Sequence, residues 1–301
     1  MVKRTLAPSH SRSYDRRMPD PTGDFSPTIR RRRLSEELKQ LRAAQGLTLE
    51  RAAEKLEWSR AKIANIETGK RLRPQVTDIR VLLDIYKVTD EERREALLEL
   101  TRQSRIKGWW TQYRDFAGAY FGFEAEASSI ATYQMGVIPG LLQTPEYAAA
   151  SARSGLVPPD DIKRVVDARV RRQRILDGET TPRLWAIIDE GALSRSVDTA
   201  NPDVMKDQIQ HLLVMTERPA VTVQVLPFSA GLHAAAAGAF VLLDFPNPLD
   251  RPIVYLETRH DGLYLEDEEK IADYRDVLDH LQGTALSPAE SVQHLTRLLT
   301  D

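Results

Sequence analysis

The stretch from Leu47 to Gly69 most constrains the fold, because it holds two helical patterns separated by a short turn. The first pattern follows Thr48, a good N-cap residue, and the second follows Ser59, another one. Gly69 stands where a helix commonly ends in a left-handed residue. Apolar residues recur at helical spacing in both patterns: Leu49, Ala52, Ala53 and Leu56, then Ile63 and Ile66. The stretch predicts a helix, a tight turn at Glu57-Trp58 and a second helix.

The second predicted helix places a polar face opposite its apolar one. With Ile63 and Ile66 pointing inward, Arg60, Lys62 and Asn65 point outward. Long polar groups near the N-terminus of a helix fit the DNA major groove, where they meet base edges and phosphates. The alternative is an ordinary helical hairpin with a solvated face. The flanking sequence favours the DNA-binding interpretation.

The run LSEELKQLRAAQGLTLERAAEKLEWSRAKIANIETGKRLRP resembles the DNA-binding domain of the lambda-repressor-like (XRE) helix-turn-helix family. The matching pieces are Leu41-Arg42, Gly46-Leu47-Thr48, Ser59-Arg60, Ile66-Glu67-Thr68-Gly69 and Pro74. In that family, the arginine of the first helix pairs with the glutamate after the recognition helix. The resemblance therefore implies that Arg42 pairs with Glu67.

Two positions depart from the family pattern. Leu49 replaces a glutamine that often contacts a phosphate, and Glu57 replaces the usual glycine of the turn. A positive φ at Glu57 would be strained, because a side chain disfavours that conformation. We expect Arg60, Lys62 and Asn65 to contact bases, whereas phosphates should mainly be contacted by Thr48, Ser59, Lys70 and Arg71. A homodimer would read half-sites about 34 Å apart, or a multiple of that.

Composition excludes several classes of protein. The 301 residues contain no Cys, so disulfides, thiol catalysis and Cys-ligated metals are ruled out. No apolar run approaches the roughly 18 residues of a membrane span, and we expect no signal peptide. The net charge of −2 combines +9 in residues 1–75 with −11 in the remainder. This asymmetry suits nucleic acid at one end of the chain and another partner at the other.

The pattern predicts three regions. Residues 1–33 read as a disordered basic tail, ending in Arg30–Arg33, which is either a DNA-tracking arm or a solvated segment. Residues 34–105 read as the helix-turn-helix DNA-binding domain, with a first helix capped by Ser35 and further helices at Val76–Tyr86 and Glu91–Ser104. Residues 106–301 read as a regulatory or partner-binding domain. The expected fold is thus multidomain: an all-α five-helix lambda-repressor-like domain, then an α+β domain.

The third region begins with a dense group of aromatic residues. Residues 108–124, GWWTQYRDFAGAYFGFE, could form a stacking surface for single-stranded nucleic acid, a packing segment between domains, or a protein interface. The few basic residues among the aromatics favour packing. Residues 124–153 read as helical, interrupted at Pro139-Gly140. The helix Asp160–Asp177 presents an arginine cluster that either binds phosphate or pairs with acids: Arg169, Arg171, Arg172 and Arg174.

From about residue 183 the apolar period changes to that of strands. The pattern predicts strands at Leu184–Asp189, Val221–Leu226, Ala239–Asp244, Ile253–Thr258 and Gly262–Glu266, the last two forming a hairpin. Helices are predicted at Pro202–Glu217, Asp267–Leu281 and Pro288–Leu299. These elements predict a mostly antiparallel sheet.

Several segments of this region, in order, resemble the C-terminal domain of actinobacterial XRE regulators of the WhiJ and antitoxin-like types. They are GWW near residue 108, EAEASSIATYQMGVIPGLLQTPEYA, the arginine-rich helix, VTVQVLPFSAGLH and IVYLET. The resemblance implies a small protein partner encoded nearby and no enzyme activity. Where relatives often have His-Pro-Gly, this chain has a run of alanines after His233.

Two alternatives to a partner-binding regulator stay open. The C-terminal region could bind a small molecule, as many repressors do. It could also be an enzyme, with Glu190, His233 and Glu257 near strand ends as acid/base groups or metal ligands. No nucleotide-binding loop, HExxH or GxSxG motif is present. We therefore expect a cytoplasmic, nucleoid-associated DNA-binding regulator with no catalytic residues, metal or cofactor.

Overall fold

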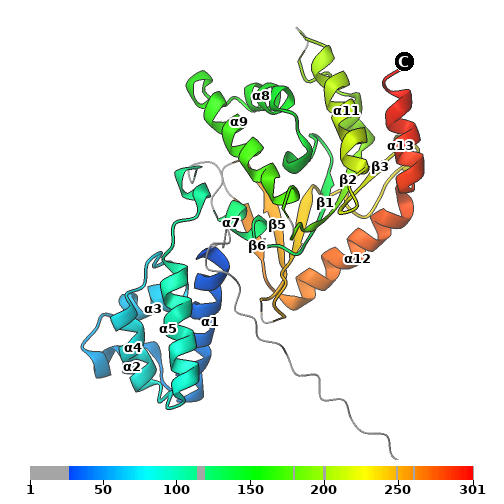
Figure 1. Cartoon of the computed structure of the whole chain (residues 1–301). Coiled ribbons are helices and arrows are strands. Elements are labelled where there is room, and N and C mark those ends of the chain that lie inside the picture. Colours follow the sequence, from blue (N-terminus) through cyan, green and yellow to red (C-terminus); the bar gives the residue numbers. More distant parts are fainter. Residues whose placement is uncertain are drawn as a thin grey trace, which may run out of the picture.

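The computed structural model describes residues 27–113, 119–178, 180–198, 201–248, 250–259 and 262–300. An all-α domain comes first, and a domain built around one six-stranded sheet follows it (Figure 1). The predicted fold class is thereby confirmed. Within the described ranges, no helix is long and apolar enough to cross a membrane.

Five helices build the first domain: α1 (Pro27–Ala44), α2 (Leu49–Leu56), α3 (Arg60–Glu67), α4 (Val76–Ile85) and α5 (Glu91–Ser104). Their apolar faces meet in one core, which includes Leu38, Ile63, Ile79 and Leu83, each with no exposed surface. The two helices predicted from Leu47–Gly69 and the fifth at Glu91–Ser104 are confirmed. The fourth ends one residue earlier than predicted.

Helix α1 begins earlier than the sequence pattern predicted. It starts at Pro27, so Ser35 is not its N-cap; the buried Ser35 Oγ instead donates to the carbonyl of Ile66 at 2.8 Å. Residues 1–26 of the predicted tail lie outside the described residues, but residues 27–33 form the first two turns of α1. Ile29 is buried in the core of the second domain. That tertiary contact stabilises turns that show no local apolar period.

Six strands form one mixed sheet in the order β3-β2-β1-β4-β5-β6. Strands β1, β2 and β3 run parallel, whereas β4, β5 and β6 add antiparallel neighbours beside β1. Their bounds are β1 (Ser129–Gln134), β2 (Arg183–Asp189), β3 (Val221–Leu226), β4 (Phe240–Asp244), β5 (Ile253–Glu257) and β6 (Gly262–Leu265). The five predicted strands and the β5–β6 hairpin are confirmed.

Strand β1 corrects the prediction that residues 124–153 are helical. Residues 129–134 lie between β2 and β4, and four of the six are buried. Because both faces of this central strand are covered, its sequence SIATYQ lacks the alternation that marks a half-exposed strand. A short buried run is ambiguous from its period alone.

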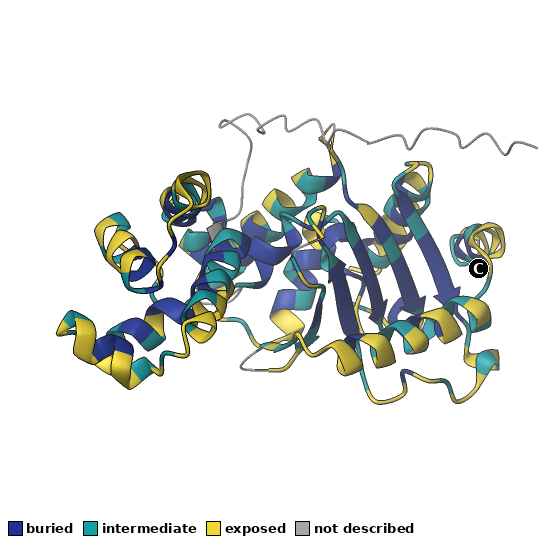
Figure 2. Ribbon diagram, turned by 90° about the horizontal axis from the view of Figure 1, so that it is seen from below, coloured by how far each residue is buried: buried dark blue, intermediate teal, exposed yellow. Residues whose placement is uncertain are grey.

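Helices cover both faces of the sheet (Figures 1 and 2). Residues of α8, α9, α11 and α13 share a core with one face, and residues of α12 share a core with the other. The remaining bounds are α7 (Tyr120–Glu124), α8 (Pro145–Ser154), α9 (Pro159–Gln173), α10 (Glu190–Ser194), α11 (Asp203–Thr216), α12 (Glu268–Thr284) and α13 (Pro288–Arg297). Short 3-10 turns lie at η1 (Trp109–Tyr113), η2 (Gly140–Leu142), η3 (Arg174–Leu176) and η4 (Phe228–Ala230).

The aromatic segment serves packing rather than nucleic-acid stacking, at least in its described part. Arg114 and Phe116 lie outside the described residues. Five aromatic side chains of the segment are buried in the core of the second domain: Trp110, Tyr113, Tyr120, Phe121 and Phe123. Buried rings cannot stack on bases, so the packing interpretation is confirmed for these residues.

The arginine cluster of α9 pairs mainly with groups of the protein itself. Arg172 Nε and Nη2 each donate to the Glu124 carboxylate at 2.7 Å, and the two side chains are 11% and 2% exposed. Arg169 donates to Gln143 at 2.6 Å. Because a buried charge needs a partner, this bidentate pair ties α9 to α7.

Candidate functional site

The turn between α2 and α3 has the geometry of a helix-turn-helix motif. The Thr48 hydroxyl accepts a hydrogen bond from the Arg51 amide at 3.2 Å, and Ser59 accepts one from Lys62 at 3.2 Å. Both predicted caps are confirmed. Glu57 has φ = 54°, which is the left-handed conformation. This conformation is strained for Glu57 because, unlike glycine, it carries a side chain. Gly69 has φ = 68°, as predicted.

A buried ion pair fixes the end of α3 to α1. Arg42 Nε donates to both Glu67 oxygens, at 3.0 and 2.9 Å, and Arg42 Nη1 donates to the carbonyl of Leu47. The Tyr86 hydroxyl donates to Glu67 at 2.7 Å. Burial and the Glu67 charge raise the pKa of Tyr86 far above its usual value, so this hydroxyl stays a donor. The implied Arg42–Glu67 pair is confirmed.

Five of the seven predicted contact residues are exposed around α2, α3 and the following loop: Thr48, Ser59, Arg60, Asn65 and Lys70. The Arg60 side chain is 64% exposed and pairs with Glu50. Asn65 and Lys70 are exposed and make no side-chain hydrogen bond or ion pair within the described residues. Exposed ion pairs contribute little to stability, so Arg60 can leave Glu50 and contact DNA instead.

Two of the predicted contact residues are turned toward the domain itself. Lys62 Nζ donates to Asp78 at 2.8 Å and lies 3.4 Å from the centre of the Trp58 ring. Arg71 pairs with the same carboxylate at 3.6 Å. Asp78 therefore holds the first turn of α4 beside α3. It also restricts the movement of the Lys62 side chain, which the sequence pattern predicted to point outward.

The placement of α4 adds residues that the sequence analysis missed. Arg73, Gln75 and Arg80 are exposed around the first turn of α4, which Asp78 holds beside α3. Gln75 is the N-cap of α4 but makes no side-chain cap hydrogen bond. The signal that could have found Arg73 and Gln75 is the run of basic and amide groups in KRLRPQ, which continues past Arg71.

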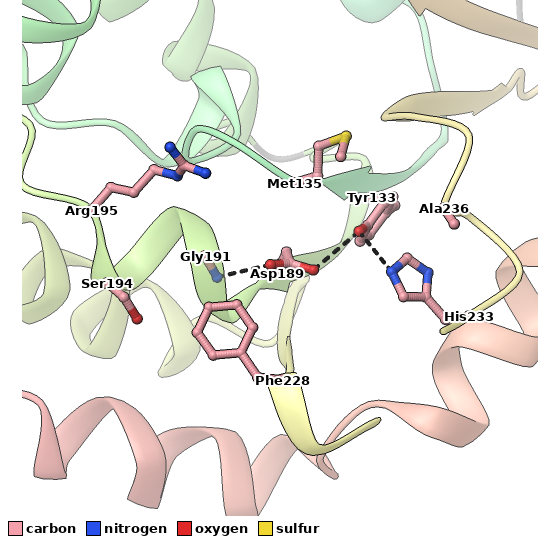
Figure 3. Close-up of a pocket in the computed structure, with 9 residues that line it drawn as sticks. All are labelled: Tyr133, Met135, Asp189, Gly191, Ser194, Arg195, Phe228, His233 and Ala236. Carbon is pink, nitrogen blue, oxygen red and sulfur yellow. Dashed lines mark hydrogen bonds between the residues drawn. The ribbon is translucent and has the colours of Figure 1, made fainter. Parts of the chain in front are cut away.

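A pocket in the second domain lies at the carboxyl ends of its parallel strands. Residues at the ends of β1 and β2, and in the segments that follow β1, β2 and β3, line a cavity of about 470 Å³ (Figure 3). The lining residues are Tyr133, Met135, Asp189, Gly191, Ser194, Arg195, Phe228, His233 and Ala236. The carboxyl edge of parallel strands is where ligands of α/β proteins usually bind.

The polar side of this pocket is centred on Tyr133. Its side chain is completely buried, and its hydroxyl lies 3.2 Å from Asp189 Oδ2 and 3.3 Å from His233 Nε2. Burial and the Asp189 charge raise the pKa of Tyr133 well above its usual value. The hydroxyl therefore remains protonated and donates to Asp189, which leaves its oxygen to accept from His233.

Two parts of the chain match known families. Residues 33–96 match the model of a helix-turn-helix domain, and residues 117–297 match the model of a domain of unknown function, DUF5753. The second match covers more than half of the chain. The chain belongs to the DUF5753 family. No curated protein and no solved structure matches it.

The N-terminal match supports a DNA-binding regulator with an XRE-like helix-turn-helix domain. The DUF5753 domain contains the whole six-stranded sheet and the Tyr133 pocket. The description of the DUF5753 family names no function.

The DUF5753 domain contacts α1 through the arginines that the sequence analysis placed in a tail. Arg32 Nη1 donates to the carbonyl of Arg251 at 2.8 Å, and Arg32 pairs with Glu266 at 2.9 Å. Arg33 pairs with Asp250, and Arg30 pairs with Glu126 at 3.8 Å. These three arginines therefore join the two domains instead of forming a free arm or a solvated segment.

The three residues considered for catalysis are not brought together in the DUF5753 domain. His233 lines the pocket, whereas Glu190 accepts a hydrogen bond from the Phe228 amide and faces His294 at 3.9 Å. Glu257 interacts electrostatically with Arg169 and Arg172 of α9. Helix α9 packs on the face of the sheet opposite to that of Tyr133. Within the described residues, no group of three or more His, Asp or Glu side chains could hold a metal ion.

Proposed function

We propose that this protein is a sequence-specific transcriptional regulator that docks α3 in the DNA major groove. The observation that carries the proposal is the two-sided character of α3. Ile63 and Ile66 are buried in the core, Glu67 is tied to Arg42, and the opposite face carries exposed polar side chains. A helix held in this way presents side chains to base edges in a fixed orientation.

In this arrangement Arg60 and Asn65 contact bases, and Lys62 joins them when it leaves Asp78. Phosphates are contacted by Thr48, Ser59, Lys70 and Arg71. The protein binds double-stranded DNA as a homodimer with half-sites about 34 Å apart or a multiple of that. A regulator of this kind acts at the nucleoid.

The test is retention of genomic DNA by the full-length protein. Purified protein is incubated with genomic fragments and excess random competitor, and the retained fragments are sequenced. We expect a shared motif, which the double variant Arg60→Ala/Asn65→Ala fails to retain. The matched control Arg174→Ala changes an exposed arginine of the second domain and should retain the same motif. Retention of no fragment above competitor contradicts the proposal.

We also propose that the DUF5753 domain binds a small partner protein encoded nearby, as in antitoxin-like regulators. Large apolar side chains are exposed in the segment after β3: Phe228 is 64% exposed and Leu232 is 97% exposed. Such residues on a soluble surface are typical of protein interfaces. This role requires binding but no catalysis, so we assign the domain no enzyme activity.

Co-purification of the tagged chain with the product of each neighbouring gene tests this partner. We expect one small protein to form a stable complex that Leu232→Ser weakens. Val214→Ser is the matched control, because Val214 is 53% exposed on α11, away from the pocket. A complex that both variants leave unchanged contradicts the assignment of this surface.

The pocket favours a second candidate function for the same domain, namely response to a small molecule. The cavity volume lies within the range of ligand sites, and its polar groups converge at one edge of the sheet. Protein and small molecule are separable by experiment, since Leu232 belongs to the proposed partner surface but does not line the cavity.

A further inference from the structure

We propose that the pocket of the DUF5753 domain binds a small zwitterion of the α-amino-acid class, with the ligand carboxylate at Arg195 and its ammonium group at Asp189. This inference names the ligand for the second candidate function. It does not depend on DNA binding, which is measured separately.

Arg195 supplies the anion-binding end of the pocket. It directly follows α10, and Figure 3 shows its guanidinium on the Gly191 side of Asp189. Within the described residues, Arg195 makes no hydrogen bond or ion pair. The planar guanidinium matches a carboxylate through two parallel hydrogen bonds. Its donors are therefore available to a ligand.

Asp189 supplies the cation-binding end. Its Oδ1 accepts a hydrogen bond from the Gly191 amide at 2.8 Å, and its Oδ2 accepts one from the Tyr133 hydroxyl. An ionised carboxylate has about four acceptor positions, so further donors can be accommodated. The two contacts hold the carboxylate in place, which reduces the entropy lost when an ammonium group binds.

Asp189 and Arg195 carry opposite charges and line the same pocket, but their side chains do not pair with each other. A ligand that bridges them must carry both signs of charge. A purely anionic ligand would leave Asp189 without a cation, and an amine would leave Arg195 without an anion. This asymmetry favours a zwitterion over either singly charged molecule.

Met135, Phe228 and Ala236 form the apolar part of the lining. Met135 is 47% exposed and Phe228 is 64% exposed, and both face the same cavity. Covering these side chains with an apolar group removes their surfaces from water. The cavity is large enough for a branched or aromatic side chain, so we expect L-leucine or L-phenylalanine to bind better than glycine.

The test uses full-length protein with ¹³C-methyl-labelled methionine. Met135 lines the pocket, whereas Met205 and Met215 lie on α11 and report on folding. L-leucine and L-phenylalanine are titrated beside two analogues of leucine that each lack one charged group, 4-methylpentanoate and isoamylamine. We expect the amino acids to shift the Met135 signal and both analogues to bind about tenfold more weakly or worse.

Two variants test which residue binds each charged group of the ligand. Arg195→Ala should weaken amino-acid binding at least about tenfold and remove the preference over isoamylamine. Asp189→Asn should remove the preference over 4-methylpentanoate, while asparagine can still cap α10. Arg174→Ala and Asp203→Asn are the matched controls, both at exposed positions.

Two results would overturn the inference. One is a Met135 signal that no amino acid shifts up to about 10 mM, in protein with native Met205 and Met215 signals. The other is unchanged binding in both pocket variants. Either result leaves the proposed DNA binding intact, because motif retention is scored on the same protein preparation.

Discussion

Arg33 holds Asp250 through both carboxylate oxygens, and this pair crosses from α1 to the loop between β4 and β5. The Asp250 side chain is 7% exposed, so the pair lies largely out of water. Together with the burial of Ile29, it makes α1 a shared element of both domains. A change in the DUF5753 domain therefore has a direct structural connection to the DNA-binding helices.

Asp250→Ala should loosen the start of α1, because Arg33 loses its partner. We expect a loss of about 1–3 kcal/mol in the local free energy of opening, typical of a charge-assisted hydrogen bond. Amide hydrogen exchange of residues 31–33 measures it, because the first amides of a helix have no acceptor within the helix. Asp207→Ala, at an exposed position of α11, is the control. Equal exchange in the two variants would show that the pair does not tether α1.

Glu67→Gln should destabilise the first domain by about 3–5 kcal/mol, because Arg42 is left partly buried without an anion. Urea unfolding of the full chain measures the change. Glu54→Gln removes an exposed partner of Arg51 and should cost no more than about 1 kcal/mol. If both variants lose the same amount of stability, the buried pair does not stabilise the motif.

Arg60→Ala should cost about 1–3 kcal/mol in operator affinity and relax the preference for one base position. The exposed Glu50 pair competes only weakly for this side chain. Competition binding against operators substituted one base at a time measures the effect. An unchanged base preference would remove Arg60 from the set of base contacts.

Lys70→Ala should weaken binding to all DNA sequences alike. It should lower the slope of log affinity against log salt concentration by about 1, because one fewer counterion is released. Titrations at several salt concentrations measure the slope. Lys163→Ala, at an exposed position of α9, should leave it unchanged. A sequence-dependent loss would argue for a base contact at Lys70.

Stability should fall in mild acid partly because of His211 on α11. Burial and the nearby Arg218 charge lower the pKa of His211, so the folded state binds fewer protons than the unfolded state. The contribution is present above about pH 6.5 and is lost as the pH falls through the folded pKa. Urea unfolding at about pH 7.5 and about pH 5.5 should show a smaller pH dependence in His211→Gln than in the native chain. An equal pH dependence in the two proteins would contradict the lowered pKa of His211.

The helix-turn-helix motif was predictable because its signals are local. Thr48 and Ser59 cap helices whose apolar residues repeat at 3.6-residue spacing, and Gly69 takes the positive φ of a helix end. Strands β2 and β3 were predictable for a similar reason, since short apolar runs rich in β-branched residues favour strands. None of these features requires knowledge of a distant segment.

The sequence by itself therefore determined the local elements, the two-domain fold class and the exposed polar face of α3. Only the tertiary structure decided that β1 is a strand, that Arg32 and Arg33 join the domains, and that Tyr133, Asp189 and His233 meet in one pocket. The physical reason is distance along the chain. Strand pairing, burial on two faces and charge pairing across about 220 residues leave no periodic signal in the sequence.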